Sequence, residues 1–216
     1  MVDNLPPPNF SGPAFAERPA PAPAPPSRVA ILPPRLQPSQ PESPGAAVPA
    51  SWIPHVPANR WYWIIVHHSA TATGGAAEFD KMHRAKGWDE LGYHFVIGNG
   101  SDTHDGQIEV GPRWPIQKWG AHDKTPGNEF NLHGIGICLV GNFDVTYPTH
   151  AQIRSLEKLV AYLMKTYHIP ADHVLGHGET KNTDCPGRHM NVAMIRRACA
   201  QMVANTTSGY RAEIPS

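Results

Sequence analysis

The pattern of hydrophobic and polar residues changes along the chain, and its second part reads as short strands alternating with helices. Apolar runs rich in β-branched and aromatic residues predict the strands. These runs cover residues 61–66, 93–97, 107–110, 134–141 and 174–176, the last being either a very short strand or a loop. The run at 134–141 is apolar almost throughout, which is typical of a central strand covered on both faces.

Three further stretches have apolar residues at the three-to-four spacing of a helix. Residues 76–86 are followed by Gly87, where a helix would stop. Thr149 is a candidate N-cap for a long helix through Leu163, and residues 190–203 predict a last helix. This alternation of strands and helices predicts an α/β domain with a central mixed sheet flanked by helices.

Proline divides the chain into two regions. Most of its 24 prolines precede residue 60, and segments such as 19–26 lack the backbone donors that helix and sheet require. Such segments favour an extended, polyproline-II-like chain. We therefore expect a disordered or semi-rigid tether at residues 1–54, a folded domain at 55–205 and a flexible tail at 206–216. The alternative for the tether is a proline-rich ligand for an aromatic-lined groove.

Composition argues against some classes of function. The formal net charge is zero, so the charge balance gives no indication of a nucleic-acid partner. No run approaches the roughly 18 apolar residues that span a bilayer, and the first residues do not resemble a secretory signal. Neither a membrane span nor an ordinary export signal is therefore expected. Three cysteines do not make a disulfide framework, whereas thirteen histidines are unusual, and histidine is a common metal ligand and proton shuttle.

Three residues are candidates for a metal site. His67 follows the first predicted strand, His177 lies in a Gly-His-Gly-Glu segment, and Cys185 comes eight residues after it. Strand ends in α/β folds open onto the ligand crevice. Two imidazoles and a thiolate suit a catalytic zinc ion, since three protein ligands leave a fourth position for water. By spacing alone, the more common interpretation is that His177 is a loop histidine and Cys185 a buried thiol.

Five motifs together carry a family resemblance. They are Ile65-Val66-His67-His68-Ser69-Ala70, Gly92-Tyr93-His94-Phe95-Val96-Ile97, Gly120-Ala121-His122, the run from Gly134 to Phe143, and Gly176-His177-Gly178-Glu179 with Thr183-Asp184-Cys185-Pro186-Gly187. In this order and spacing they resemble the zinc-dependent N-acetylmuramoyl-L-alanine amidases, a family that includes amidase-type phage lysozymes and peptidoglycan recognition proteins. The resemblance covers residues 58–204 and implies an amidase-type domain built on the predicted sheet.

The resemblance implies a role for several residues. The zinc ligands of the family match His67, His177 and Cys185. A family tyrosine that positions the attacking water or hydrogen-bonds the oxyanion matches Tyr93. Thr183 matches a position that can donate a weaker hydrogen bond to the same oxygen. The alternative for Tyr93 is an ordinary strand tyrosine, and the alternative for Thr183 is a loop threonine without a catalytic role.

The other histidines of these motifs receive different roles. His122 matches a histidine that lines the cleft, so we expect it to bind substrate or to assist proton transfer, with a surface position as the alternative. His68 is expected to pack beside the site, because neighbouring strand residues point to opposite faces. His94 follows Tyr93, is expected to face away from it, and is assigned no role.

The chain departs from one branch of the family. Recycling amidases of the cytoplasm carry a catalytic glutamate on the central strand and an aspartate as the third ligand. The matching positions here are Cys138 and Cys185. This departure argues against the recycling branch and leaves no strand carboxylate as an obvious general base.

The reaction that the resemblance implies is hydrolysis of the amide between N-acetylmuramic acid and L-alanine in peptidoglycan. A muropeptide-binding module without turnover is the main alternative, and a zinc endopeptidase is another. Peptidoglycan or muropeptides are the expected partners. The protein is expected to act as a monomer in the periplasm or outside the cell. The sequence leaves the stem-peptide specificity open.

Overall fold

A computed structural model describes residues 48–209, with side chains described to residue 205. Its sheet has five strands in the order β3-β2-β4-β1-β5. Their bounds are β1 Trp63–His68, β2 Phe95–Ile97, β3 Ile108–Val110, β4 Gly134–Leu139 and β5 Val174–Gly176. The central pairs are parallel, and β3 is antiparallel to β2. The predicted mixed sheet flanked by helices is therefore confirmed.

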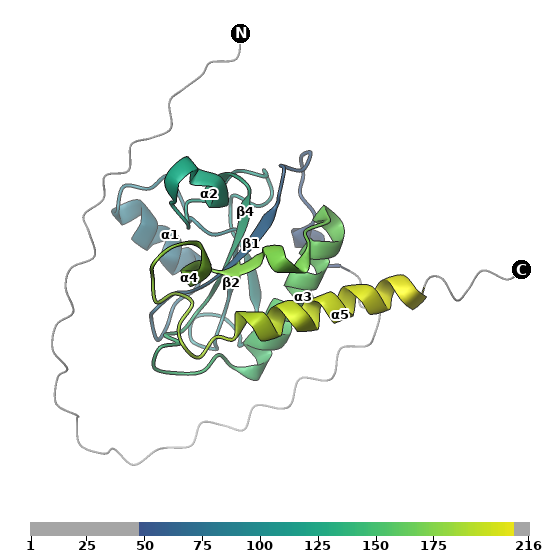
Figure 1. Cartoon of the computed structure of the whole chain (residues 1–216). Helices are drawn as coiled ribbons and strands as arrows, with labels where there is room; N and C mark the ends of the chain where they lie inside the picture. Colours follow the sequence, from purple (N-terminus) through teal and green to yellow (C-terminus); the bar gives the residue numbers. More distant parts are fainter. Residues whose placement is uncertain (1–47, 210–216) are drawn as a thin grey trace, which may run out of the picture. The chain divides into compact units, whose positions relative to one another are not determined.

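Helices cover both faces of this sheet (Figure 1). The α-helices are α1 Ala76–Ala85, α2 Glu129–Leu132, α3 His150–Tyr167, α4 His177–Thr180 and α5 Val192–Gly209. Short 3-10 turns are η1 Ala50–Trp52, η2 Pro126–Asn128 and η3 Ala171–His173. The predicted cap of α3 is a capping box, in which Gln152 N donates to Thr149 Oγ1 at 3.0 Å and Thr149 N donates to Gln152 Oε1 at 3.1 Å.

The two faces of the sheet differ in what they bury. One face, here called the apolar face, packs against α3 and α5 in the larger core of the domain. Its strand residues are Ile64, Val66, Phe95, Ile97, Ile135, Ile137 and Leu139. The opposite face, here called the site face, carries a smaller cluster against Phe79 of α1. Its residues are Val96, Cys138 and Val140, together with His67, which is paired with Cys138 in the parallel register.

Several element boundaries differ from the prediction by a few residues. β1 continues past Val66 because His67 and His68 pair with Cys138 and Leu139 of β4. The last helix runs to Gly209 rather than ending at residue 203. Trp52, which the sequence assigned to the tether, is buried in the core, and its carbonyl accepts a hydrogen bond from Trp114 Nε1 at 2.8 Å.

Most of the proposed tether and tail, residues 1–47 and 210–216, lies outside the described residues, so both stay predictions. Within residues 48–209, no helix has the length and apolar character needed to cross a bilayer.

Candidate metal centre

Three donor side chains meet at one end of the sheet. His67 lies near the end of β1, His177 is the first residue of α4, and Cys185 lies in the loop that follows. Their ligand atoms all lie within 4.8 Å of one another, and Cys185 Sγ is 3.7 Å from His67 Nδ1. Two imidazoles and a thiol are donors that zinc accepts, and three of them leave room for a fourth ligand. The set expected from the sequence therefore fits zinc.

Strand pairing brings the two histidines together. β1 and β5 are parallel neighbours, and Val66 is opposite Gly176 in their register. The next residue on each chain is a histidine, so His67 and His177 emerge side by side at the carboxyl ends of the strands. Their ring centroids are 4.4 Å apart. This is the edge of a parallel sheet where ligand sites usually form.

The two neighbouring histidines of β1 point to opposite faces, as strand geometry requires. His67 is buried on the site face, whereas the His68 ring lies 6.0 Å from Phe143 in the larger core. His68 Nδ1 accepts a hydrogen bond from Phe143 N at 3.1 Å. The backbone N of His68 also lies 3.4 Å from Cys185 Sγ. His68 therefore supports the site through its backbone, while its side chain belongs to the core.

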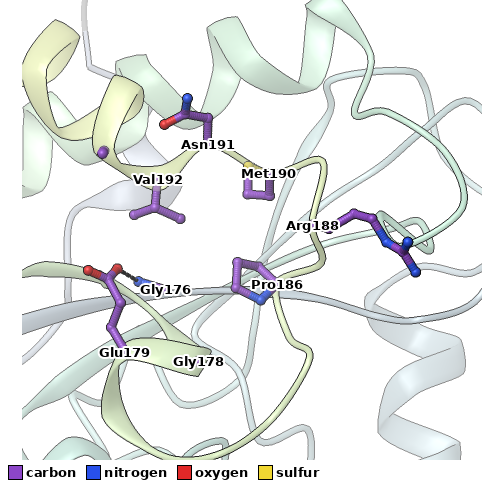
Figure 2. Close-up of a pocket in the computed structure, with 9 residues that line it drawn as sticks. Gly176, Gly178, Glu179, Pro186, Arg188, Met190, Asn191 and Val192 are labelled. Atoms are coloured by element: carbon purple, nitrogen blue, oxygen red, sulfur yellow. Dashed lines mark hydrogen bonds between the residues drawn. The ribbon is translucent and has the colours of Figure 1, made fainter.

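The start of α4, directly after β5, is fixed by a carboxylate (Figure 2). Glu179 accepts a hydrogen bond from Gly176 N at 2.7 Å and pairs with Arg196 of α5 at 2.8 Å. A hollow of about 370 Å³ lies beside α4. It is lined by neighbours of the donors rather than by the donors themselves: Gly176, Gly178, Glu179, Pro186, Arg188, Met190, Asn191, Val192 and Ala193. Pro186 and Val192 come close to Gly176, where a larger residue would crowd both.

His122, which the resemblance assigns to the cleft, is mostly buried in the structure. It is buried behind His67, with its Nδ1 3.0 Å from His67 Nε2. Its Nε2 lies 3.2 Å from the carbonyl oxygen of Gly134. A carbonyl only accepts, so Nε2 of His122 carries the proton and Nδ1 of His122 is the acceptor. His67 then donates from Nε2, which leaves the lone pair of its Nδ1 beside Cys185.

Burial keeps these two rings neutral. Desolvation, aided by neighbouring histidines, lowers the pKa of His67 well below its ordinary value. Desolvation likewise lowers the pKa of His122 to about 4, against the hydrogen bond to Gly134, which raises it. A neutral imidazole is the form that binds a metal.

Asp123, which the sequence did not single out, lies beside His177. Its carboxylate is fully buried, with Oδ1 3.3 Å from His177 Nε2 and 3.3 Å from Lys181 Nζ. Oδ2 accepts from Thr180 Oγ1 at 2.6 Å. Burial raises the pKa of Asp123, but His177, Thr180 and Lys181 outweigh it and leave the pKa below its ordinary value. The only sequence signal was an acidic residue directly after a motif histidine.

Tyr93 lies beside His67, one of the three candidate ligands. Its ring centroid is 5.2 Å from that of His67. Burial, together with the nearby thiols of Cys138 and Cys185, raises the pKa of the phenol well above its ordinary value. The hydroxyl is therefore protonated at neutral pH and can donate a hydrogen bond.

Thr183 is exposed on the loop before the cysteine, and its Oγ1 accepts from Cys185 N at 3.3 Å. Burial also raises the pKa of the Cys185 thiol to about 12, although the His68 backbone N–H lowers it. A metal ligand must be a thiolate, so binding of a cation releases this proton and becomes tighter as pH rises.

His94 is fully buried, and both of its ring nitrogens hydrogen-bond to backbone atoms. Gly136 N donates to its Nδ1 at 3.0 Å, and its Nε2 lies 3.0 Å from the Lys118 carbonyl oxygen. Burial lowers its pKa to about 3.

Residues 57–188 match the family described as N-acetylmuramoyl-L-alanine amidase. The chain belongs to this family. It is 33% identical over 132 residues to the endolysin of Escherichia phage T7, which covers 57% of this chain and 78% of the endolysin. Its fold is similar to that of the amidase LysC from Clostridium intestinale, with a TM-score of 0.56, 32% identity, and coverage of 64% of this chain and 85% of LysC.

Larger relatives match over a smaller share of their length. The chain is 33% identical over 119 residues to the N-acetylmuramoyl-L-alanine amidase of Sus scrofa. That alignment covers 52% of this chain but only 18% of the relative. The chain thus corresponds to one part of such proteins.

Proposed function

We propose that this protein is a zinc-dependent amidase that hydrolyses the bond between N-acetylmuramic acid and L-alanine in peptidoglycan. The observation that carries the proposal is the convergence of His67, His177 and Cys185, with ligand atoms within 4.8 Å, beside a protonated Tyr93. Membership of the amidase family supports the choice of substrate. Because peptidoglycan lies outside the cytoplasmic membrane, we place the action in the periplasm or outside the cell.

A zinc ion bound at this site would polarise the scissile carbonyl and lower the pKa of water from about 15.7 to near 7. The chain supplies what surrounds that chemistry. His67 and His177 offer neutral imidazoles, and Cys185 offers a thiolate that offsets part of the cation's charge. Tyr93 lies beside His67, and its hydroxyl pairs with the Cys138 thiol. We propose that this hydroxyl turns to donate a hydrogen bond to the carbonyl oxygen as negative charge develops there.

Thr183 is proposed to add a weaker hydrogen bond to the same oxygen. Cys138 stands on the central strand beside Tyr93, where the recycling branch carries a catalytic glutamate. Burial raises its pKa well above the ordinary value, so it stays a neutral thiol and does not act as a general base. The proposed enzyme therefore relies on the metal and the phenol rather than on a strand carboxylate.

The test is digestion of purified peptidoglycan by zinc-loaded protein, with mass spectrometry of the soluble products. Release of intact stem peptides beginning at L-alanine is expected. Cys185→Ala should abolish the release, whereas Cys199→Ala, a matched removal of a buried thiol on α5, should leave it unchanged.

Two outcomes would contradict the proposal. Binding to peptidoglycan without released peptide would indicate a recognition module. Fragments cut elsewhere in the stem peptide would indicate an endopeptidase.

A further inference from the structure

Two consecutive residues contact the two metal histidines separately. His122 touches His67, and Asp123 touches His177. We propose that this His122-Asp123 pair is a positioning device, which fixes the tautomer and ring orientation of both histidine ligands without touching metal or substrate. The inference rests on the proposed zinc site and assigns His122 a role different from the substrate contact that the family resemblance implied.

The first arm of the device is a chain of hydrogen bonds running from β4 to His67. The Gly134 carbonyl accepts from His122 Nε2, and His122 Nδ1 accepts from His67 Nε2. Each bond dictates the next, because an imidazole with one nitrogen donating must accept at the other. The result is a His67 ring whose Nδ1 lone pair points toward Cys185. Both ring nitrogens of His122 are occupied, so it has none left for substrate.

The fold builds a slot for the His122 ring. A Cβ added at Gly120 or at Gly136 would collide with that imidazole, so the ring occupies space that two glycines leave free. The backbone is held as well, since His122 N and Asp123 N both donate to Asn131 Oδ1 at 2.8 Å. A ring with this support has little freedom to turn away from His67.

The second arm is the carboxylate of Asp123. Thr180 holds Oδ2 at 2.6 Å, and Oδ1 lies 3.3 Å from both His177 Nε2 and Lys181 Nζ. Oδ1 and His177 Nε2 are buried without a hydrogen-bond partner among the described residues, so each can serve the other after a small adjustment. A carboxylate beside one imidazole nitrogen favours the tautomer with its proton there and leaves the other nitrogen for a metal. Buried charge is tolerated where it is paired, and Lys181 supplies the compensating cation. The loop that carries His122 and Asp123 therefore orients the imidazoles of both His67 and His177.

The test compares isosteric variants that differ only in polar atoms. In His122→Asn, the side-chain oxygen can replace Nδ1 as acceptor, whereas His122→Leu removes every acceptor. Asp123→Asn and Asp123→Leu form the same comparison for the second arm. Zinc affinity is measured on the full chain by competition with a chromophoric chelator. We expect each Leu variant to bind zinc 10–100-fold more weakly, the usual effect of removing a partner of a metal ligand, and each Asn variant to recover much of the loss.

His94→Asn is the control for loss of a buried histidine. His94 is as deeply buried as His122 but bonds only to backbone, so its loss should lower the melting temperature and leave zinc affinity unchanged. At saturating zinc, the variants of the pair should show an unchanged KM, because neither residue touches substrate.

Several outcomes would overturn the inference. Equal zinc affinity in the Leu variants and the wild type would do so, as would an equal loss in His94→Asn. A raised KM with normal zinc affinity would instead favour the cleft-lining role for His122. Absence of zinc binding by the wild type is a separate result, because it would remove the proposed function itself.

Discussion

The same strands build two faces of very different chemistry. On the apolar face, β1, β2 and β4 bring Ile, Val, Phe and Leu side chains against α3 and α5 in one continuous core. On the site face, those strands present His67 and Cys138, and Gly136 leaves space for His122. Burial alone does not distinguish the faces, since His67 and Ile64 are both almost inaccessible. The difference is whether the buried atoms need hydrogen-bond partners.

This difference separates stability from function. Apolar burial contributes stability in proportion to area and needs no direction. Buried imidazoles and carboxylates contribute only when their hydrogen bonds are directed, and those directions define the proposed metal site. Substitutions on the apolar face should therefore change the free energy of unfolding, and substitutions on the site face should change metal binding and turnover. The following predictions run from the largest expected effect to the smallest.

The sharpest comparison is between two neighbouring histidines. His67→Ala should lower amidase activity by about a thousandfold or more, because the several kcal/mol of transition-state stabilisation that a metal supplies would be lost. His68→Ala should keep activity within about tenfold, but leaves Phe143 N unpaired and costs about 1–3 kcal/mol of stability. Peptide release measures the effect on activity. Urea unfolding in the presence of a chelator measures the effect on stability. Equal losses of activity would show that the faces are not separable.

A truncation on the apolar face should have the opposite effect: stability should fall while activity is retained. Leu159 of α3 is fully buried, so Leu159→Ala should reduce the free energy of unfolding by about 2–5 kcal/mol while activity per folded molecule is retained. Met194→Ala on α5 is the control, since Met194 is 47% exposed and its loss should stay within about 0.5 kcal/mol. Urea denaturation measures both. A folded Leu159→Ala protein with impaired turnover would contradict the separation.

The apolar face was accessible from sequence because its signal is local. Apolar runs rich in β-branched and aromatic residues indicated the five strands, the last as a short strand or a loop, and helical spacing indicated the helices α1, α3 and α5. Their ends were less accurate, since periodicity does not say where pairing stops; β1 gains His67 and His68 only through β4. The four-residue α2 has no such pattern, and its Asn131 is held by side-chain hydrogen bonds.

The site face was accessible only in part. His67, His177, Cys185 and Tyr93 stand in recognisable motifs, and the structure brings them together. The place of His122 behind His67 depends on a contact across 55 residues and on two glycines that leave room for its ring. Neither feature has a local pattern. Asp123 had still less signal, because a carboxylate gains its role only from what surrounds it in the fold.

Buried histidines should make stability depend on pH. The pKa of His94 is lowered to about 3 and that of His83 to about 4, mainly by burial. Below the unfolded pKa of 6.5, the unfolded state binds protons that the native state refuses, so stability falls as pH decreases and is unaffected above that value. Each such group contributes up to about 1.4 kcal/mol per pH unit.

Replacing one of these histidines should flatten the profile. Metal-free His94→Asn, unfolded in urea at several pH values between 7 and 4.5, is expected to lose less stability per pH unit than the wild type. The slope below pH 6 should decrease by up to about 1.4 kcal/mol per pH unit. Parallel profiles for the two proteins would mean that His94 is protonated in the native state.

The smallest effect is expected at the start of α3. Thr149 accepts from Gln152 N and donates to Asp105 Oδ1 at 2.6 Å, far from the metal ligands in the chain. Thr149→Ala should cost about 1 kcal/mol of unfolding free energy, the usual value of an N-cap, and Thr149→Ser should restore most of it. Zinc affinity and peptide release should match the wild type in both. If Thr149→Ala weakened zinc binding, α3 would be coupled to the site face, and the two faces would not act independently.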